Sequence, residues 1–161
     1  MPALDQLRSA KPPWVHLVVL DDGDTPGSVL TTPSGFAART IDGRRARTKR
    51  GLLAECARAF EFPAGSGRNW DAFEEMLADL EWLPAKGYLL VVKDADELLA
   101  DDPEDYDTFI DIVKAVGKEW ATPRRGASAR PAVPFHLCLT VARERVHARQ
   151  SWAVPRLSIR R

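Results

Sequence analysis

The chain has 161 residues, of which 45% are hydrophobic and 29% are charged, and its formal net charge at pH 7 is zero. This length and composition predict one globular domain with at most a small appendage, and five Trp and six Phe residues can fill its core. No apolar run approaches the roughly 20 residues that a membrane-spanning helix needs. The N-terminus lacks a basic region followed by an apolar core and a cleavage site, so we expect no secretion signal.

Two cysteines, Cys56 and Cys138, lie far apart in apolar settings. Their placement favours buried free thiols over a disulfide, which fits a reducing cytoplasm. The three histidines form no short-spaced set with Cys or carboxylates, so we expect no metal site and no cofactor. No nucleophile elbow or phosphate-cradling glycine loop is present, and we therefore do not expect an enzyme.

Charge is segregated along the chain. In residues 71–111, fourteen carboxylates against two cations, Lys86 and Lys93, leave a net charge of −12. Basic stretches lie on either side, at 44–50 and at 143–161. This segregation indicates either internal charge matching or two surfaces with different partners.

Hydrophobic patterns predict alternating strands and helices, with polar loops at 25–34 and 123–134. Strands joined by helical crossovers are parallel, so we expect an α/β fold with a parallel sheet. Asp102 and Pro103 predict the start of the last helix, with Asp102 as its N-cap. In chain order the expected elements are strands at 14–20 and 36–41, helices at 48–60 and 69–80, a strand at 88–92, a helix at 102–120 and a strand at 135–141.

The helix expected at 69–80 has an acidic face. Asn69 is a natural N-cap, because its side-chain carbonyl can accept a hydrogen bond from a free amide of the first turn. Asp71, Glu75 and Asp79 lie four residues apart on one exposed ridge, where like charges cost roughly 0.2–0.5 kcal/mol each. The ridge therefore either faces a cationic partner or is covered by the basic stretch at 44–50. The apolar register of the helix is formed by Trp70, Phe73, Leu77 and Leu80.

The run Gly67-Arg68-Asn69-Trp70-Asp71-Ala72-Phe73, with Glu75, Leu77, Trp82 and Pro84 after it, resembles the barstar family of ribonuclease inhibitors. The order of expected elements is similar too. The resemblance implies a small parallel three-stranded sheet packed by helices, which an N-terminal edge strand could extend. It divides the chain into an N-terminal extension with an added strand at 1–35, a barstar-like domain at 36–141 and a basic C-terminal tail at 142–161.

The resemblance also implies a function and a site. In such inhibitors, the second helix and the loop before it plug the active site of a secreted ribonuclease. By position, Asp71 and Glu75 match inhibitory carboxylates, and Glu74 stands where an interfacial tryptophan is expected. The implied partner is an extracellular-type ribonuclease or related nuclease toxin, held inactive in the cytoplasm. The implied partner-binding residues are Gly67, Asn69, Trp70, Asp71, Glu74, Glu75 and Glu119.

Two other functions stay open. The arginine-rich stretches could make the chain a nucleic-acid-binding or regulatory protein, although few aromatic residues are interleaved with them for base stacking. The acids that follow Val92, beginning with Asp94, could serve a metal-dependent hydrolase at the carboxyl edge of a parallel sheet. A solvated loop and a helix cap also explain those acids.

Overall fold

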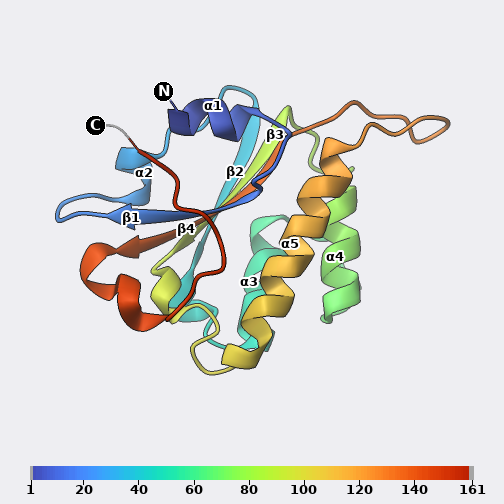
Figure 1. The fold of residues 1–161 in the computed structure, drawn as a ribbon. Helices are drawn as coiled ribbons and strands as arrows, with labels where there is room; N and C mark the ends of the chain where they lie inside the picture. Colours follow the sequence, from blue (N-terminus) through green and yellow to red (C-terminus); the bar gives the residue numbers. More distant parts are fainter. Residues whose placement is uncertain (1, 160–161) are drawn as a thin grey trace.

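The computed structural model describes residues 2–159, and its centre is a sheet of four parallel strands in the order β1-β4-β3-β2 (Figure 1). The α/β class is confirmed. The expected count of three strands is one short, because the N-terminal strand pairs along its full length with β4. The strands are β1 (Val15–Leu20), β2 (Phe36–Asp42), β3 (Gly87–Lys93) and β4 (Phe135–Ala142).

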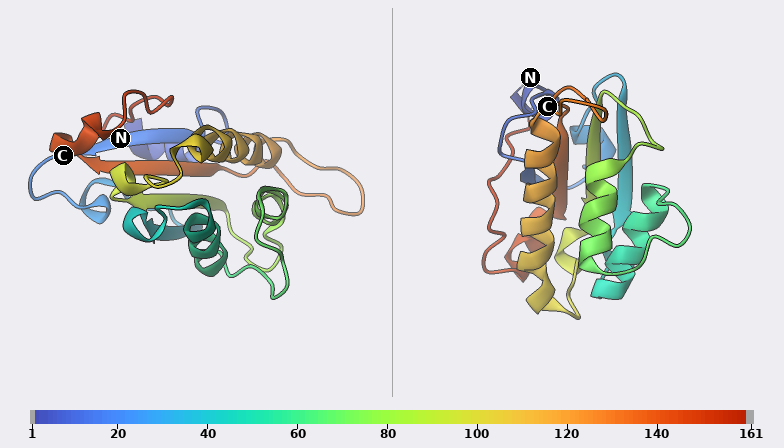
Figure 2. Two further views of the ribbon diagram at one scale, coloured as in Figure 1. Left: turned by 90° about the horizontal axis from the view of Figure 1, so that it is seen from below. Right: turned by 90° about the vertical axis from the view of Figure 1, so that its right-hand side faces the viewer.

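Three helices cover one face of the sheet (Figures 1 and 2). They are α3 (Lys49–Ala59), α4 (Trp70–Asp79) and α5 (Tyr106–Ala121). Their apolar stripes and the facing strand residues form the larger hydrophobic core, in which Leu77, Leu90 and Phe109 are fully buried. None of the helices in residues 2–159 is long and apolar enough to span a membrane.

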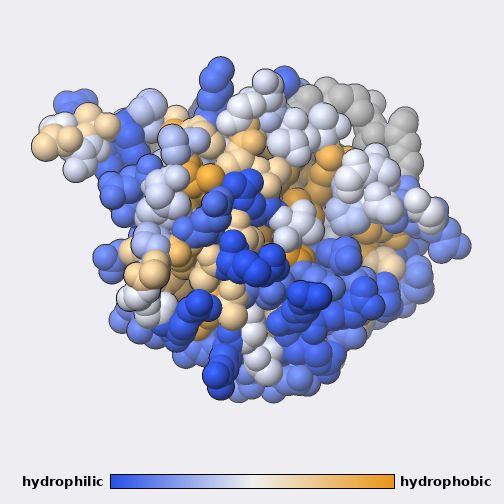
Figure 3. All heavy atoms as spheres, turned by 180° about the vertical axis from the view of Figure 1, so that it is seen from behind, coloured by the Kyte–Doolittle hydropathy of each residue, from blue (hydrophilic) through white to orange (hydrophobic). Residues whose placement is uncertain are grey.

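The opposite face of the sheet is covered by both ends of the described chain. Leu7 of helix α1 (Pro2–Arg8), Leu30 and Leu157 pack on Val18 and other strand residues in a second, smaller core. The C-terminal segment also runs beside β1, where Leu17 N–H donates to Pro155 O and Leu157 N–H donates to Leu17 O. Seen from behind, hydrophobic residues reach the surface only in separate areas among hydrophilic ones (Figure 3).

Two histidines lie buried beneath the N-terminal segment. His16 Nε2 and His136 Nδ1 are 2.9 Å apart, and His136 Nε2 lies 2.7 Å from the carbonyl oxygen of Ser9. Since a carbonyl oxygen can only accept, His136 carries its proton on Nε2 and accepts from His16 at Nδ1. Burial lowers the pKa of both imidazoles, that of His16 to about 3.

Some local expectations are wrong. The segment expected as a loop at 25–34 contains a short helix, α2 (Pro26–Val29), capped by Thr25. Asp102 does not cap the helix after it: its Oδ2 accepts a hydrogen bond of 2.8 Å from Lys49 N at the start of α3. That carboxylate lies at the positive end of the α3 dipole, which stabilises it there. The remaining turns are the 3-10 helices η1 (Gly43–Arg45), η2 (Ala95–Glu97), η3 (Pro103–Asp105) and η4 (Arg143–Ala148).

Candidate partner-binding surface

The start of α4 is fixed by local hydrogen bonding. Asn69 Oδ1 accepts a hydrogen bond of 2.8 Å from Ala72 N, as expected of an N-cap. Gly67, two residues earlier, has a φ of +70°, a left-handed backbone conformation that is strained for residues with a side chain. Phe73 and Leu77 then anchor the helix in the core. The loop and the first turn therefore present their exposed residues in one defined arrangement.

The end of α4 is fixed by side chains from α5 and the loop after it. Trp120 Nε1 donates to Leu77 O at 2.8 Å, and Arg130 Nη2 donates to Ala78 O at 2.9 Å. The guanidinium of Arg130 also lies over the indole of Trp120. These contacts satisfy carbonyl groups that the last turn of a helix leaves without partners. Because both ends are held, α4 is a rigid platform.

The acids of α4 form no close ion pairs among the described residues, although the charge of Asp79 acts on Arg130. Asp71 and Glu75 are exposed, and Glu74 is partly exposed. Within residues 2–159, none of the three forms an ion pair, and neither does Asp79. The negative charge of this helix is therefore available to a second molecule.

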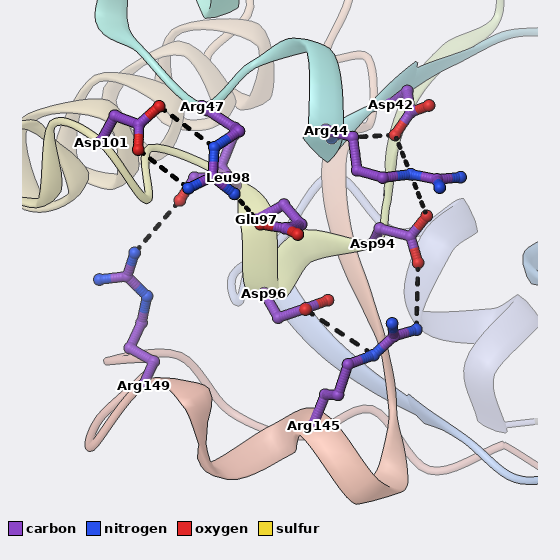
Figure 4. A network of polar contacts seen from close by, with 10 residues as sticks. All are labelled: Asp42, Arg44, Arg47, Asp94, Asp96, Glu97, Leu98, Asp101, Arg145 and Arg149. Atoms are coloured by element: carbon purple, nitrogen blue, oxygen red, sulfur yellow. Dashed lines mark hydrogen bonds and ion pairs between the residues drawn. The ribbon is translucent and has the colours of Figure 1, made fainter.

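The basic stretch at 44–50 pairs with acids elsewhere (Figure 4). Arg44 lies 3.3 Å from Asp94, and Arg47 pairs with Asp101 at 2.9 Å as well as with Glu97. The hydrogen bonds of Arg47 lower the pKa of the Asp101 carboxyl. The internal charge matching that the sequence left open thus exists, but it covers the η2 region and leaves α4 open.

Arginines of the C-terminal segment complete the same network. Arg145 pairs with Asp94 and Asp96, and Arg149 donates to Leu98 O at 3.3 Å while its guanidinium lies 3.6 Å from the ring centroid of Tyr106 (Figure 4). Because these arginines contact acids and a carbonyl of the same chain, fewer arginines are free to bind the phosphates of a nucleic acid. Of the acids after Val92, Asp94, Asp96, Glu97 and Asp101 pair with arginines, and Asp102 accepts from Lys49 N.

Three of the expected contact acids meet in one groove. It lies between α4 and α5, has a volume of about 330 Å³ and is floored by small side chains such as Ala78 and Ala115. Glu74 and Glu75 line its α4 side, and Glu119 lines its α5 side. Glu119 alone of these acids has an internal partner, since its Oε1 lies 2.8 Å from Arg124 Nη2.

Trp70 contributes to both the core and the surface. Its indole is partly buried and meets the Phe73 ring edge-on, with 5.9 Å between ring centroids. The ammonium of Lys49 lies 5.3 Å from the Trp70 ring centroid. Gly67 lies at a different place, in a hollow of about 640 Å³ between α3 and the loop that precedes α4. The hollow and the groove thus lie at separate places beside α4.

Sequence reasoning missed Arg124 and Arg130, which hold α4 and Glu119 from a segment expected only to be a polar linker. The arginines within that linker were the signal in the sequence that it could contact acids or helix carbonyls. No group of three or more potential metal ligands occurs among the residues that the structure describes.

Comparison with known proteins agrees with this arrangement. A family model described as Barstar (barnase inhibitor) matches residues 36–140, well over half of the chain. No curated protein and no solved structure matches the chain significantly. The match begins at β2 and ends in β4, so β1 and the segments that cover the second face lie outside it.

Proposed function

Since the chain belongs to the barstar family, we propose that it inhibits a ribonuclease of the barnase kind by inserting α4 and the preceding loop into its active site. A ribonuclease must hold the phosphates of RNA, and cationic side chains do this. Carboxylates on α4 take the place of those phosphates. Inhibition then needs only occlusion of the cleft, with no chemistry and no cofactor on the part of the inhibitor.

One observation supports this proposal most strongly: Asp71, Glu74 and Glu75 lie together on α4 and form no ion pair among the described residues. An exposed cluster of one sign speeds association with an oppositely charged cleft and selects its orientation. The chain contains arginines that could neutralise α4, yet they pair with the acids around η2 instead. These arginines therefore leave Asp71, Glu74 and Glu75 without an ion pair.

The rigidity of α4 adds to this support. A flexible segment loses conformational entropy when it binds, whereas a segment that is already ordered in the free protein does not, so it binds more tightly. Asn69 at one end of α4 and Arg130 at the other keep the helix in place before any partner arrives. A fixed helix also keeps the spacing between Asp71 and Glu75 constant.

We propose that inhibition takes place in the cytoplasm, before the ribonuclease is exported. Cys56 and Cys138 are both free and buried, as is usual where thiols stay reduced. Burial raises the pKa of both thiols, which keeps them protonated and unreactive. Nucleic-acid binding is the weaker alternative, because Arg44, Arg47 and Arg145 are held by the protein's own acids.

Inhibition of barnase by the purified chain tests the proposal. We expect the double variant Asp71→Ala with Glu75→Ala to weaken inhibition at least about 100-fold, because both charges lie at the contact centre. The matched control is Asp107→Ala with Asp111→Ala, which removes two exposed acids from α5 and should change inhibition little. Thermal unfolding shows whether each variant is folded.

Three results would contradict the proposal. The wild-type chain could leave barnase fully active at micromolar concentration. Both double variants could weaken inhibition equally, which would reduce the effect to overall charge. Loss of the cooperative unfolding transition in the α4 double variant would show that Asp71 and Glu75 serve the fold.

A further inference from the structure

The segment between α5 and β4, residues 122–134, forms a long loop. Loops of this length without helix or strand are uncommon in small domains and are often functional. This loop projects beyond the C-terminal ends of α4 and α5 (Figures 1 and 2), and from behind it stands clear of the body of the molecule (Figure 3). Arg124 and Arg130 exchange backbone hydrogen bonds of 2.9 and 3.2 Å at its base, so the two strands of the loop are held together there.

The base of this loop puts a cation beside Glu119, at the edge of the acidic groove. Arg124 Nη2 donates to Glu119 Oε1 at 2.8 Å; Arg124 is partly exposed and Glu119 is exposed. The same nitrogen lies 3.5 Å from Ala78 O at the end of α4. Arg124 thus occupies the site that a partner's cation would need in order to use Glu119. Arg125, the next residue, is exposed and forms no ion pair within the described chain.

We propose that Arg124 is a specificity-determining residue that masks Glu119 and leaves Asp71, Glu74 and Glu75 as the open acids of the expected contact. A partner cation can take the place on Glu119 Oε1 only by displacing Arg124. The partner that fits is therefore a protein whose cationic cleft lies over α4 and whose rim, where it meets the loop, is neutral or acidic. A basic rim there would be repelled by Arg124 and Arg125. This inference rests on the proposed function and adds to it which of the acids the partner engages.

The expected size of the effect follows from the ion pair. Pairs between partly exposed side chains are weak, and releasing one of their members changes an affinity by roughly two- to fivefold. Removing Arg124 should therefore strengthen the binding of a cationic probe by that factor. Removing Glu119 from the wild-type chain should change binding less than about twofold, because Arg124 already neutralises it.

Calorimetric titration with a hexa-arginine peptide at low ionic strength tests the masking directly. Arg125→Gln is the matched control for Arg124→Gln, since each removes one positive charge from the same loop. We expect Arg124→Gln to bind the peptide two- to fivefold more tightly than Arg125→Gln, and Glu119→Gln added to Arg124→Gln to abolish this difference. Equal affinities of the two arginine variants would overturn the inference. The inference would also be overturned if Glu119→Gln alone lost as much affinity for the peptide as Glu75→Gln does.

Barnase inhibition by the same variants separates this inference from the proposed function. If the inference holds, Arg124→Gln inhibits more strongly than Arg125→Gln. If the wild-type chain does not inhibit barnase, the proposed function fails, and the peptide titrations still decide whether Arg124 masks Glu119. If barnase is inhibited and the two arginine variants behave alike, only the masking role is wrong.

Discussion

The guanidinium carbon of Arg130 lies 3.4 Å from the ring centroid of Trp120, while two guanidinium nitrogens donate to Ala78 O and Asp79 O. One side chain thereby joins the loop, α5 and the last turn of α4. A lysine keeps the charge but has no planar fork for both carbonyls and the ring. We expect Arg130→Lys to lower the free energy of unfolding by about 1–2 kcal/mol, measured by urea denaturation.

Hydrogen exchange locates this effect. The amides in the last turn of α4 should exchange faster in Arg130→Lys, while those of β3 keep their protection. Arg125→Lys, at an exposed position of the same loop, should change neither the stability nor the exchange. A uniform loss of protection across the whole chain would contradict a local role for Arg130.

The N-cap of α4 gives a second prediction. Asn69→Ala removes the acceptor for Ala72 N, and we expect it to lower the free energy of unfolding by about 1 kcal/mol. Asn69→Asp keeps an oxygen at the same position and should restore most of the stability. Thermal unfolding of the three proteins checks this order. Equal midpoints for the alanine and aspartate variants would show that the cap contributes nothing.

The buried histidine pair predicts a pH dependence. Burial lowers the pKa of His16 to about 3 and lowers that of His136, while both titrate near 6.5 in an unfolded chain. Below pH 6.5 the unfolded state therefore binds protons that the folded state does not. Stability should be fully present above about pH 6.5 and fall as the pH decreases toward 3, by up to about 1.4 kcal/mol per unit for each histidine.

Denaturant unfolding between pH 4 and 8 measures this slope. Replacing both buried histidines by leucine should flatten it across the acidic half of the range. His147→Gln, which alters an exposed histidine, serves as the control and should leave the slope as it is. If the leucine variant keeps the wild-type slope, other groups cause it.

The cover of the second face gives a fourth prediction. Leu157 is 3% exposed and packs in the smaller core, although it lies outside the region that the family model matches. We expect Leu157→Ala to destabilise the chain by about 2–4 kcal/mol, because it leaves a cavity against the sheet. Ser158→Ala, at the exposed neighbouring position, should have little effect. Chemical denaturation of both variants makes the comparison.

The sequence was most informative where a pattern repeats. The apolar steps of α4 and the cap at Asn69 predicted that helix within a residue, and the continuous apolar run predicted β3. The four residues of α2 are too few to show a period, which is why they were expected as a loop. Asp102 was misassigned because a carboxylate near two helix starts can cap either, and only the tertiary arrangement decides.

Side-chain pairing was out of reach of the sequence. Whether residues 44–50 cover α4 or the η2 region depends on how β2 and β3 bring those segments together. Glu119 and Arg124 are five residues apart, yet their ion pair depends on the turn that the chain makes after α5. Local patterns therefore predicted which residues could bind a partner, but they could not show which were already engaged.

The second face of the sheet has a practical consequence. Helix α1 and the segment around Leu157 lie on it, while α4 lies in the layer on the opposite face (Figure 1). A label placed on that face, for example at exposed Ser158, would therefore lie on the side of the sheet away from α4. The molecule can be tethered to a sensor chip there with α4 still accessible in solution.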